Sequence, residues 1–288
     1  MTHQGSVYLN GEFLPLTEAK VSVLDRGFIF GDGIYEVIPA YGARLFRLPH
    51  HLQRLDQGLA AIHLANPLSH SQWQTLLDEL IELNDGGDQS LYLQITRGVA
   101  ERNPRFPVDT QPTVFAMSTP IEVVEPQRRQ GIHAVTVEDI RWKLCHIKTI
   151  SLLPNILLRQ QALDAGADEA IILRDGEVTE GTASNIFIVR DGVVITPPKG
   201  QLLLPGITRD LVMELCQRHN IPCEEQNIDE LSLREADEIW LTSSTREIIP
   251  VIELDQQPLA NGRPGPMWEK VIHYYQAYKQ AFREGREE

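Results

Sequence analysis

The amino-acid sequence predicts an α+β fold with two domains, and three observations support this prediction. Many short runs alternate apolar and polar residues, and several are joined by Asn-Gly or Asp-Gly pairs, which favour tight hairpin turns. Amphipathic helical stretches lie between these runs, without the regular strand–helix alternation of a parallel sheet. A chain of 288 residues is also long enough for two domains rather than one.

The domain boundary is expected in the polar stretch TPIEVVEPQRRQG, near residues 118–130, which has the composition of a linker. It divides the chain into an N-terminal α/β domain, residues 1–120, and a C-terminal α+β domain, residues 121–288. The sequence shows no internal repeat and no low-complexity segment.

In the N-terminal half, two short strands are expected to meet at Asn10-Gly11, and a later pair at Tyr41-Gly42. One amphipathic helix is predicted in PHHLQRLDQGLAAIHL, and a second in SQWQTLLDELIELND, with Ser69 or Ser71 as its N-cap. The strands SLYLQITRG and TVFAMSTPI enclose a long loop with several prolines and arginines, which is typical of a functional loop. The apolar face expected for the first helix consists of Leu52, Leu55, Leu59 and Ile62.

In the C-terminal half, HAVTVEDIRW alternates like a strand, and the helix after it is expected to begin at Asn155 and end at Gly166. DEAIILRDGEVTEG and NIFIVRDGVVITP each predict a hairpin around an Asp-Gly pair. LLLPGITRDLVMELCQRHNIP predicts a turn into a helix with Thr208 as its N-cap. A strand, a Ser/Thr-rich turn, another strand and a terminal amphipathic helix complete the chain. The apolar face expected for the helix after Thr208 consists of Leu211, Leu215 and Cys216.

Composition and motifs exclude several classes of protein. The formal net charge of −14 argues against nucleic acid or an anionic membrane as the main partner. The three cysteines lack disulfide or zinc spacing, which indicates reduced thiols and a cytoplasmic location. The first residues show no signal-peptide pattern, and no apolar run approaches the ~18 residues of a membrane span. We find no metal-ligand spacing, no G-x-S-x-G nucleophile motif and no complete glycine-rich nucleotide loop.

Lys148 has the surroundings that a covalent catalyst needs. It lies at the predicted junction of a strand and a helix, with Ile147 before it and Ile150 after it. Apolar surroundings solvate an ammonium group poorly, which favours the neutral, nucleophilic amine. A lysine at a strand end is more often a solvated edge charge. Of the other five lysines, however, four lie in polar turns, before a strand or on the expected solvent face of the terminal helix, and Lys143 lies beside Trp142. Elimination therefore favours Lys148 as a Schiff-base lysine.

A Schiff-base lysine implies pyridoxal phosphate, and this cofactor requires three further groups. The helix start at Gly206-Ile207-Thr208, with the hydroxyls of Ser243 and Ser244, offers an anion site, although an ordinary capped helix has the same pattern. Glu180, in VTEGTASNIF, is a candidate carboxylate for the pyridine nitrogen, although a solvated turn residue would look the same. Arg54 could supply a second cation, although an arginine on an amphipathic helix normally faces solvent.

Several motifs occur in the order found in the class IV aminotransferases, the fold-type IV pyridoxal-phosphate enzymes. They are DRGFIFGDGIYE, HHLQRL, EDIRW…IKT…LLPN, VTEGTASNIF, LLLPGITRD and LTSSTREIIPV. These motifs span nearly the whole chain, which therefore resembles this family, and within it the D-amino-acid (D-alanine) transaminases most closely. The resemblance implies the two-domain architecture of that group, with the active site at the domain and subunit interface.

The resemblance also implies a role for each matching position. Lys148 would hold the cofactor as an imine and move the proton between the substrate Cα and the cofactor, and Glu180 would bind the pyridine nitrogen. Leu204 would pack near the cofactor ring. Tyr35 and Arg102 would bind the substrate carboxylate, and because the loop of Arg102 comes from the partner subunit in the family, a homodimer is implied. The implied phosphate ligands are Arg54, Ile207, Thr208 and Ser244.

One position departs from the family pattern. D-alanine transaminases commonly have a histidine two residues after the loop arginine, where this chain has Pro104 followed by Arg105. Arg105 is therefore expected to take part in binding the substrate. Two guanidinium groups would suit dicarboxylates such as glutamate and 2-oxoglutarate.

Together these features predict a cytoplasmic, dimeric, pyridoxal-phosphate-dependent transaminase that moves the amino group of D-alanine to 2-oxoglutarate. Two alternatives share the fold: a branched-chain L-amino-acid transaminase, against which GDGIYE argues, and a 4-amino-4-deoxychorismate lyase. A cofactor-free binding protein that kept the fold is an alternative of a different class. The absence of a visible absorption band after addition of pyridoxal phosphate would favour that last alternative.

Overall fold

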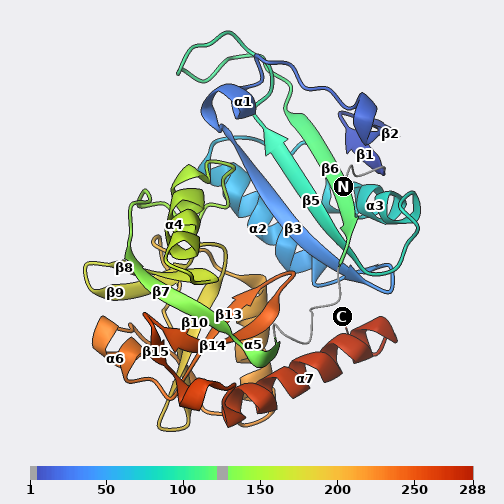
Figure 1. Ribbon diagram of the computed structural model, residues 1–288. Coiled ribbons are helices and arrows are strands. Elements are labelled where there is room, and N and C mark those ends of the chain that lie inside the picture. Colours follow the sequence, from blue (N-terminus) through green and yellow to red (C-terminus); the bar gives the residue numbers. More distant parts are fainter. Residues whose placement is uncertain (1–4, 122–128, 288) are drawn as a thin grey trace. The chain divides into compact units, whose positions relative to one another are not determined.

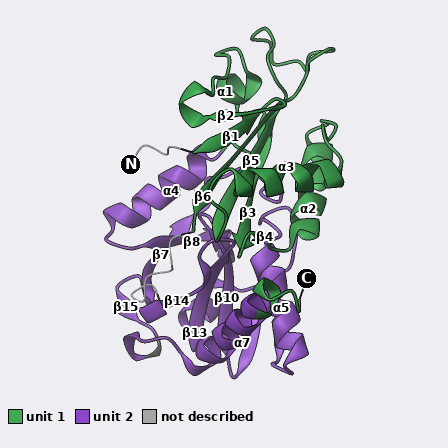
Figure 2. Cartoon of the chain, turned by 90° about the vertical axis from the view of Figure 1, so that its right-hand side faces the viewer, with its two compact units in different colours: residues 1–121, 147–151, 281–288 green, residues 122–146, 152–280 purple. Residues whose placement is uncertain are grey.

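The computed structural model describes residues 5–121 and 129–287 (Figure 1). The chain folds into two compact units (Figure 2). Unit 1 contains residues 1–121, 147–151 and 281–288, and unit 2 contains residues 122–146 and 152–280. Residues 147–151, which include Lys148, were expected in a C-terminal domain, whereas their contacts group them with unit 1.

Unit 1 is built on a six-stranded antiparallel sheet with the strand order β2-β1-β6-β5-β3-β4. The hairpin predicted at Asn10-Gly11 is confirmed, and these residues have φ values of 51° and 104°. The strand pair predicted near Tyr41 is also confirmed, with Gly42 and Ala43 at φ 60° and 62° in its turn. The strands are β1 (Ser6–Leu9), β2 (Glu12–Pro15), β3 (Gly33–Tyr41), β4 (Arg44–Leu45), β5 (Gln89–Thr96) and β6 (Thr113–Pro120).

Helices α2 (Leu48–Ala61) and α3 (His70–Glu82) pack on one face of this sheet. The predicted apolar face of α2 is confirmed, since Leu52, Leu55 and Leu59 are buried in the shared core. Ser69 is the N-cap of α3, as expected, and it forms a capping box with Gln72. Burial of apolar surface between the two helices and the sheet is the main stabilising contribution to this unit.

Unit 2 contains a mixed nine-stranded sheet. The two predicted Asp-Gly hairpins are confirmed, with Asp175 and Asp191 at φ 54° and 51°. One strand–helix–strand unit was not predicted: β7 and β8 pair in parallel, and helix α4 (Leu153–Asp164) connects them. The strands are β7 (Ile132–Glu138), β8 (Glu169–Arg174), β9 (Glu177–Gly181), β10 (Asn185–Arg190), β11 (Val193–Thr196), β12 (Cys223–Glu225), β13 (Glu238–Ser243), β14 (Glu247–Leu254) and β15 (Gln257–Pro258).

Two helices of unit 2 begin at residues other than those expected. Helix α4 starts at Leu153 rather than Asn155, because Pro154 suits the first turn of a helix, and the Asn155 side chain instead donates to the carbonyl oxygen of Thr182 (2.9 Å). Helix α5 (Ile207–Arg218) has Gly206 rather than Thr208 as its N-cap. The buried face predicted for α5 is confirmed for Leu211, Leu215 and Cys216.

Three further expectations need correction or fall outside the described residues. A short helix, α1 (Arg26–Phe30), was not predicted in the glycine-punctuated stretch, where Asp25 caps it. Lys279 of α7 (Pro266–Arg283) was expected to face solvent, but its ammonium group pairs with Glu247. Of the expected linker, residues 118–120 belong to β6, and residues 122–128 lie outside the described residues. The remaining helices are η1 (Leu16–Glu18), α6 (Glu230–Arg234) and η3 (Ala260–Gly262).

Candidate active site

The candidate lysine lies in a short segment, residues 147–151, that extends the sheet of unit 1. The backbone N–H of Tyr35, on β3, donates to the carbonyl oxygen of Lys148 at 3.0 Å. Thr149 lies opposite Ile34 in an isolated antiparallel bridge. Residues that are directly opposed in an antiparallel pair project from the same face of the sheet. The side chains of Lys148 and Tyr35 therefore share one face.

Lys148 and Tyr35 contact each other on the sheet face that α2 and α3 leave uncovered. Side chains alternate along a strand, and because Ile34 is buried in the helix-side core, Tyr35 projects from the opposite face. The Lys148 Nζ atom lies 4.1 Å from the centre of the Tyr35 ring, within cation–π distance. Tyr35 in turn stacks on Tyr92 at 5.7 Å between ring centres. The amine thus projects over an aromatic surface.

Tyr92, which stacks on Tyr35, remains a neutral hydrogen-bond donor. Burial, and to a lesser degree the neighbouring Tyr35, raise the pKa of Tyr92 to about 12. Its hydroxyl donates to the side-chain oxygen of Gln94 at 2.7 Å.

On the helix side of β3, a buried carboxylate binds two side chains of α2. Glu36 accepts hydrogen bonds from Nε and Nη2 of Arg54, both at 2.8 Å, and lies 2.8 Å from Nδ1 of His51. Burial raises the pKa of Glu36, but the charge and hydrogen bonds of Arg54 outweigh it and hold that pKa well below its ordinary value. Arg54 is only 7% exposed, so the alternative of an ordinary solvent-facing arginine on an amphipathic helix does not hold.

The long loop between β5 and β6 carries the two arginines expected to bind substrate. Both Arg102 and Arg105 are exposed. The Arg102 guanidinium carbon lies 5.7 Å from the centre of the Phe30 ring. Pro104, which occupies the family's histidine position, is also exposed on this loop. The loop presents two cationic groups to solvent within one short stretch.

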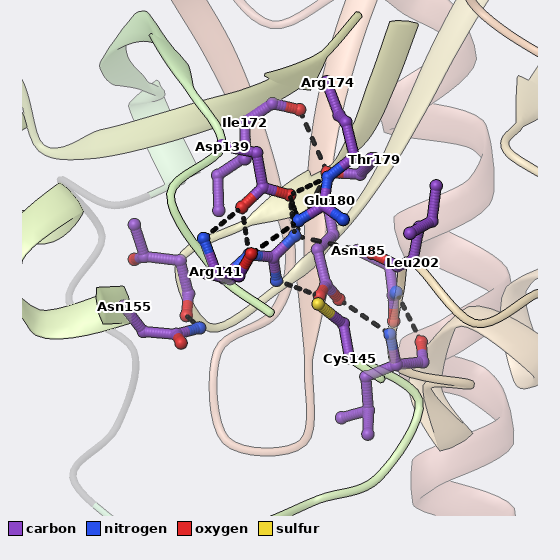
Figure 3. A network of polar contacts seen from close by, with 12 residues as sticks. Asp139, Arg141, Cys145, Asn155, Ile172, Arg174, Thr179, Glu180, Asn185 and Leu202 are labelled. Carbon is purple, nitrogen blue, oxygen red and sulfur yellow. Dashed lines mark hydrogen bonds and ion pairs between the residues drawn. The ribbon is translucent and has the colours of Figure 1, made fainter. Parts of the chain in front are cut away.

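In unit 2, Glu180 is buried in a polar network (Figure 3). One carboxylate oxygen accepts from Nη1 of Arg141, and the other accepts from the backbone N–H of Leu204 at 3.0 Å. Arg141 also donates from Nε and Nη2 to Asp139 at 3.0 and 2.9 Å. Arg174 donates to the same aspartate at 3.1 Å. Two guanidinium groups therefore balance two carboxylates.

The charges in this network are stabilised by one another. Burial raises the pKa of Asp139, but the hydrogen bonds and charge of Arg141 outweigh it and hold that pKa below its ordinary value. Burial lowers the pKa of Arg141, yet the hydrogen bond to Asp139 and the charge of Glu180 raise it above its usual range. Burial also raises the pKa of the nearby Cys145 thiol, which donates to the carbonyl oxygen of Trp142 at 3.2 Å. Cys145 is thus a protonated structural thiol.

Leu204 and Asn185 connect Glu180 to the start of α5. The N–H of Leu204 donates to Glu180, and its carbonyl oxygen accepts from the side-chain amide of Asn185 at 2.8 Å. A Cβ atom at Gly206 would lie only 1.9 Å from the Asn185 side-chain oxygen, so a larger residue does not fit there. The buried carboxylate and the first turn of α5 are therefore held by the same short turn.

The start of α5 has the features of an anion site. In the described part of the chain, no side chain caps this helix. Two buried hydroxyls of the same unit, Oγ of Ser184 and Oγ1 of Thr242, have no hydrogen-bond partner among the described residues. Thr242 lies opposite Asn185 in the β10–β13 ladder, and Asn185 contacts Gly206. Backbone N–H groups at a helix start, together with hydroxyl donors, suit a phosphate group.

The structure divides the predicted site residues into one set in each unit. Within unit 1, Lys148 contacts Tyr35, whereas Arg54 is bound to Glu36. Within unit 2, Glu180 contacts Leu204, which lies three residues before the start of α5. The set in unit 1 consists of Lys148, Tyr35, Arg54, Arg102 and Arg105, and the set in unit 2 consists of Glu180, Leu204, Ile207, Thr208, Ser243 and Ser244.

Sequence reasoning missed the residues that hold these side chains in place, chiefly Arg141, Asn185 and Glu36. Each lies in or beside a strand whose polar residues look, in the sequence alone, like a solvent-facing edge. All three are less than 9% exposed, because tertiary packing buries them. The motifs EDIRW, TASNIF and GDGIYE contained them, but no local pattern showed that a partner from another strand or helix would be present.

Among the helices of the described residues, none combines the length and apolar character that crossing a membrane requires. Within residues 5–121 and 129–287, no cluster of three or more His, Cys, Asp or Glu side chains is arranged to hold a metal ion. The three cysteines, Cys145, Cys216 and Cys223, are free thiols.

Comparison with known proteins places these features in a family context. The family model for class IV amino-transferases matches residues 33–254. A D-alanine aminotransferase from Bacillus licheniformis is 40% identical over 265 residues, which are 92% of this chain and 94% of that protein.

Solved structures show the same fold. A branched-chain aminotransferase from Thermoproteus uzoniensis, solved with norvaline, superimposes with a TM-score of 0.85 at 29% identity and covers 99% of this chain and 96% of its own. A T.th. branched-chain amino acid aminotransferase complexed with N-(5'-phosphopyridoxyl)-L-glutamate superimposes with a TM-score of 0.89 at 25% identity, covering 98% and 95%.

Proposed function

Because this chain belongs to the class IV aminotransferase family, we propose that it moves the amino group of a D-amino acid, D-alanine above all, to 2-oxoglutarate. Membership makes the chain a pyridoxal-phosphate-dependent aminotransferase that acts on amino acids and 2-oxo acids. One observation carries the choice of donor: the 40% identity with a D-alanine aminotransferase extends over 92% of the chain, whereas the two branched-chain enzymes share 29% and 25%.

The chain's own residues fit the cofactor. Bound pyridoxal phosphate supplies an aldehyde and an electron-withdrawing ring. The chain offers a lysine above the Tyr35 ring, a buried carboxylate, and a helix start in the same unit as two buried hydroxyls that lack partners among the described residues. Gly206 lets Asn185 pack directly against the backbone at that helix start, which fixes the first turn of α5.

We assign the attachment of the cofactor to Lys148. The edge pairing with β3 fixes the lysine backbone, while the four-carbon side chain above Tyr35 remains free to turn. A lysine amine is a suitable nucleophile for an aldehyde, and it is also a suitable base for the proton on the substrate Cα. One residue therefore serves both the covalent attachment and the proton transfer.

The groups of unit 2 are assigned to the other parts of the cofactor. Glu180, which forms an ion pair with Arg141, would face the pyridine nitrogen. A negative charge at this point would keep the nitrogen protonated, which would increase electron withdrawal by the ring. Leu204 would pack against the ring. The phosphate is assigned to Ile207, Thr208, Ser243 and Ser244, with Arg54 as the accompanying cation.

Tyr35, Arg102 and Arg105 are assigned to the carboxylates of the substrate. A guanidinium group binds a carboxylate through two parallel hydrogen bonds, which a lysine does not reproduce. Neither Arg102 nor Arg105 has a carboxylate partner among the described residues. Two such groups match the two carboxylates of 2-oxoglutarate, which supports it as the acceptor.

A donor screen tests this proposal directly. The enzyme is incubated with D-alanine or L-alanine plus 2-oxoglutarate, and pyruvate is measured. We expect D-alanine to exceed L-alanine by at least about 100-fold in kcat/KM, because the carboxylate clamp decides which face of the substrate is presented. Turnover of L-valine without turnover of D-alanine would replace this function with that of a branched-chain enzyme. Release of pyruvate from 4-amino-4-deoxychorismate without an acceptor would indicate the lyase.

The exposed face of α4 supports the homodimer that the family resemblance implies. The exposed apolar residues of α4 follow helical spacing on one side of the helix. An exposed apolar row of this kind is typical of an interface. We propose a second copy of the chain as its partner, in the reducing cytoplasm that the free thiols suit. Sedimentation of the wild type as a dimer, and of a Leu157→Glu variant as a monomer, is expected, and a monomeric wild type would refute the dimer. The exposed row consists of Leu153, Ile156, Leu157 and Leu163, at 65%, 60%, 53% and 50% exposure.

A further inference from the structure

A tight turn in unit 1, Gly31-Asp32-Gly33, supports the segment that carries the candidate lysine. The hydroxyl of Ser151 donates to the carbonyl oxygen of Gly31 at 3.1 Å, and the N–H of Ile150 donates to that of Gly33 at 3.1 Å. Gly31 has φ +65°, and a Cβ atom there would lie 2.4 Å from the Ser151 hydroxyl oxygen. The close fit of turn and segment therefore depends on glycine.

The central residue of this turn binds two buried arginines. Oδ2 of Asp32 accepts from Nε of Arg26 at 2.7 Å and from Nε of Arg97 at 2.9 Å. These arginines are 3% and 4% exposed. Burial raises the pKa of Asp32, but the hydrogen bonds and charges of Arg97 and Arg26 outweigh it and hold that pKa below its ordinary value. Asp32 is thus a charged counter-ion for both guanidinium groups at neutral pH.

The same two arginines hold the long loop between β5 and β6, which runs beside α1 (Figure 1). Nη1 of Arg26 donates to the carbonyl oxygens of Asn103 and Arg105 at 2.6 and 3.3 Å. The Arg97 guanidinium carbon lies 3.9 Å from the centre of the Phe106 ring. The loop is therefore tied at three points to groups that depend on one carboxylate.

Two cationic side chains of the anchored loop are exposed and have no carboxylate partner in the described ranges. Arg102 and Arg105 are exposed, and no carboxylate in the described ranges pairs with either. A guanidinium on a fixed backbone loses less conformational freedom when it binds an anion. In a chain of net charge −14, two cations held in this way form a local site for a small carboxylate.

We propose that Asp32 is a positioning residue for substrate recognition: through Arg26 and Arg97 it fixes the loop whose Arg102 and Arg105 bind the carboxylates of a dicarboxylic substrate. This inference rests on the proposed function, in which that loop binds the substrate. Because the turn around Asp32 also holds residues 150 and 151, the lysine segment and the arginine loop are fixed to the same three residues.

The test substitutes Asp32→Asn, which keeps the shape of the side chain and removes its charge. Two buried guanidinium groups then lose their counter-ion, so the loop detaches more often. Trypsin cuts after Arg102 and Arg105, and we expect cleavage there to be about fivefold faster than in the wild type, because proteolysis follows the population of the open loop.

Steady-state kinetics separate positioning from a general loss of structure. We expect KM for D-alanine and for 2-oxoglutarate to rise about tenfold in the variant while kcat changes less than about threefold, because uniform binding is lost and not chemistry. Affinity for pyridoxal phosphate, measured by fluorescence quenching, should be unchanged. A merely structural role would instead lower the cofactor affinity and leave KM unchanged.

Two further variants make the test specific. Asp56→Asn makes the same chemical change at a carboxylate of unit 1 that pairs with His70 and Asn66, away from the loop, and should alter neither cleavage nor KM. Should Asp32→Asn fail to fold, Phe106→Ala removes the contact with Arg97 without leaving a buried charge unpaired. Phe106→Ala should also speed cleavage of the loop and raise KM, by smaller factors than Asp32→Asn.

Faster cleavage together with a raised KM supports the proposal. Cleavage at the wild-type rate overturns it, and so does faster cleavage with unchanged KM. A wild-type protein that turns over neither enantiomer of alanine refutes the proposed function instead. Protection of the loop from trypsin by 2-oxoglutarate then decides the inference: protection that is lost in Asp32→Asn supports it, and an absence of protection in the wild type overturns it.

Discussion

At the scale of single residues, the chain pairs several carboxylates with buried arginines. Glu180 is bound by Arg141, Glu36 by Arg54, and Asp32 by two arginines. Removing one partner of a buried pair costs more than the pair contributes to stability, because an uncompensated charge remains in a medium of low polarity. Conservative substitutions are therefore the appropriate probes of these residues.

Replacement of Glu180 by glutamine tests the assignment to the pyridine nitrogen. The amide keeps the shape of the side chain but lacks the negative charge that would hold the nitrogen protonated. We expect cofactor affinity to change little and the single-turnover rate with D-alanine to fall on the order of 100-fold. Glu177→Gln, on the same strand β9 but exposed, is the matched control and should behave as the wild type. Unchanged single-turnover kinetics in Glu180→Gln would reject the assignment.

At the scale of elements, the parts that the sequence predicted correctly are those whose signal is local. The Asn10-Gly11 hairpin and the buried face of α2 depend on residues a few positions apart. The pairing of residues 147–151 with β3 was not predicted, because its partners lie more than a hundred positions away. Gly206 as the N-cap of α5 was missed for a related reason, since its close contact with Asn185 is tertiary.

The packing of α3 on the sheet gives a stability prediction at this scale. Leu77 is fully buried in the core of unit 1. Its replacement by alanine removes apolar contacts and leaves a cavity, which should lower the free energy of unfolding by about 2–5 kcal/mol in urea titrations. Leu83→Ala, just past the end of the same helix at 47% exposure, should change it by less than about 0.5 kcal/mol. Equal effects at both positions would mean that the core is not organised around α3.

At the scale of the whole molecule, each unit combines an apolar core with buried carboxylates that depend on arginine partners. In unit 2, Glu169 is fully buried between Arg159 and Arg246. Burial raises the pKa of Glu169, but the hydrogen bond from Thr182 and the charge of Arg159 outweigh it and hold that pKa below its ordinary value. In unit 1, burial likewise raises the pKa of Glu36, and the charge of Arg54 outweighs it and holds that pKa below its ordinary value. The stability of both units is therefore linked to pH.

The sign of this linkage predicts acid sensitivity. The pKa values of Glu36, Glu169 and Asp139 lie below 4.5, 4.5 and 3.8 in the folded chain, so the unfolded chain binds more protons in acid. Their stabilising contribution is complete above about pH 4.5 and is lost as the pH falls further. Burial lowers the pKa of His51 below 6.5, so protonation of His51 in the unfolded chain also reduces the stability of the folded chain below that pH. Calorimetric melting temperatures should fall steeply below pH 4.5, and a temperature that stays constant down to pH 3 would contradict this account.

The central claim is that Lys148 attaches the cofactor. The loaded enzyme is reduced with borohydride and digested with trypsin, and the phosphopyridoxyl label is located by mass spectrometry. We predict the label on Lys148, within the peptide LCHIKTISLLPNILLR, because trypsin does not cut after the modified lysine. A label on any of the other five lysines, or none on a protein that binds the cofactor, would contradict the claim.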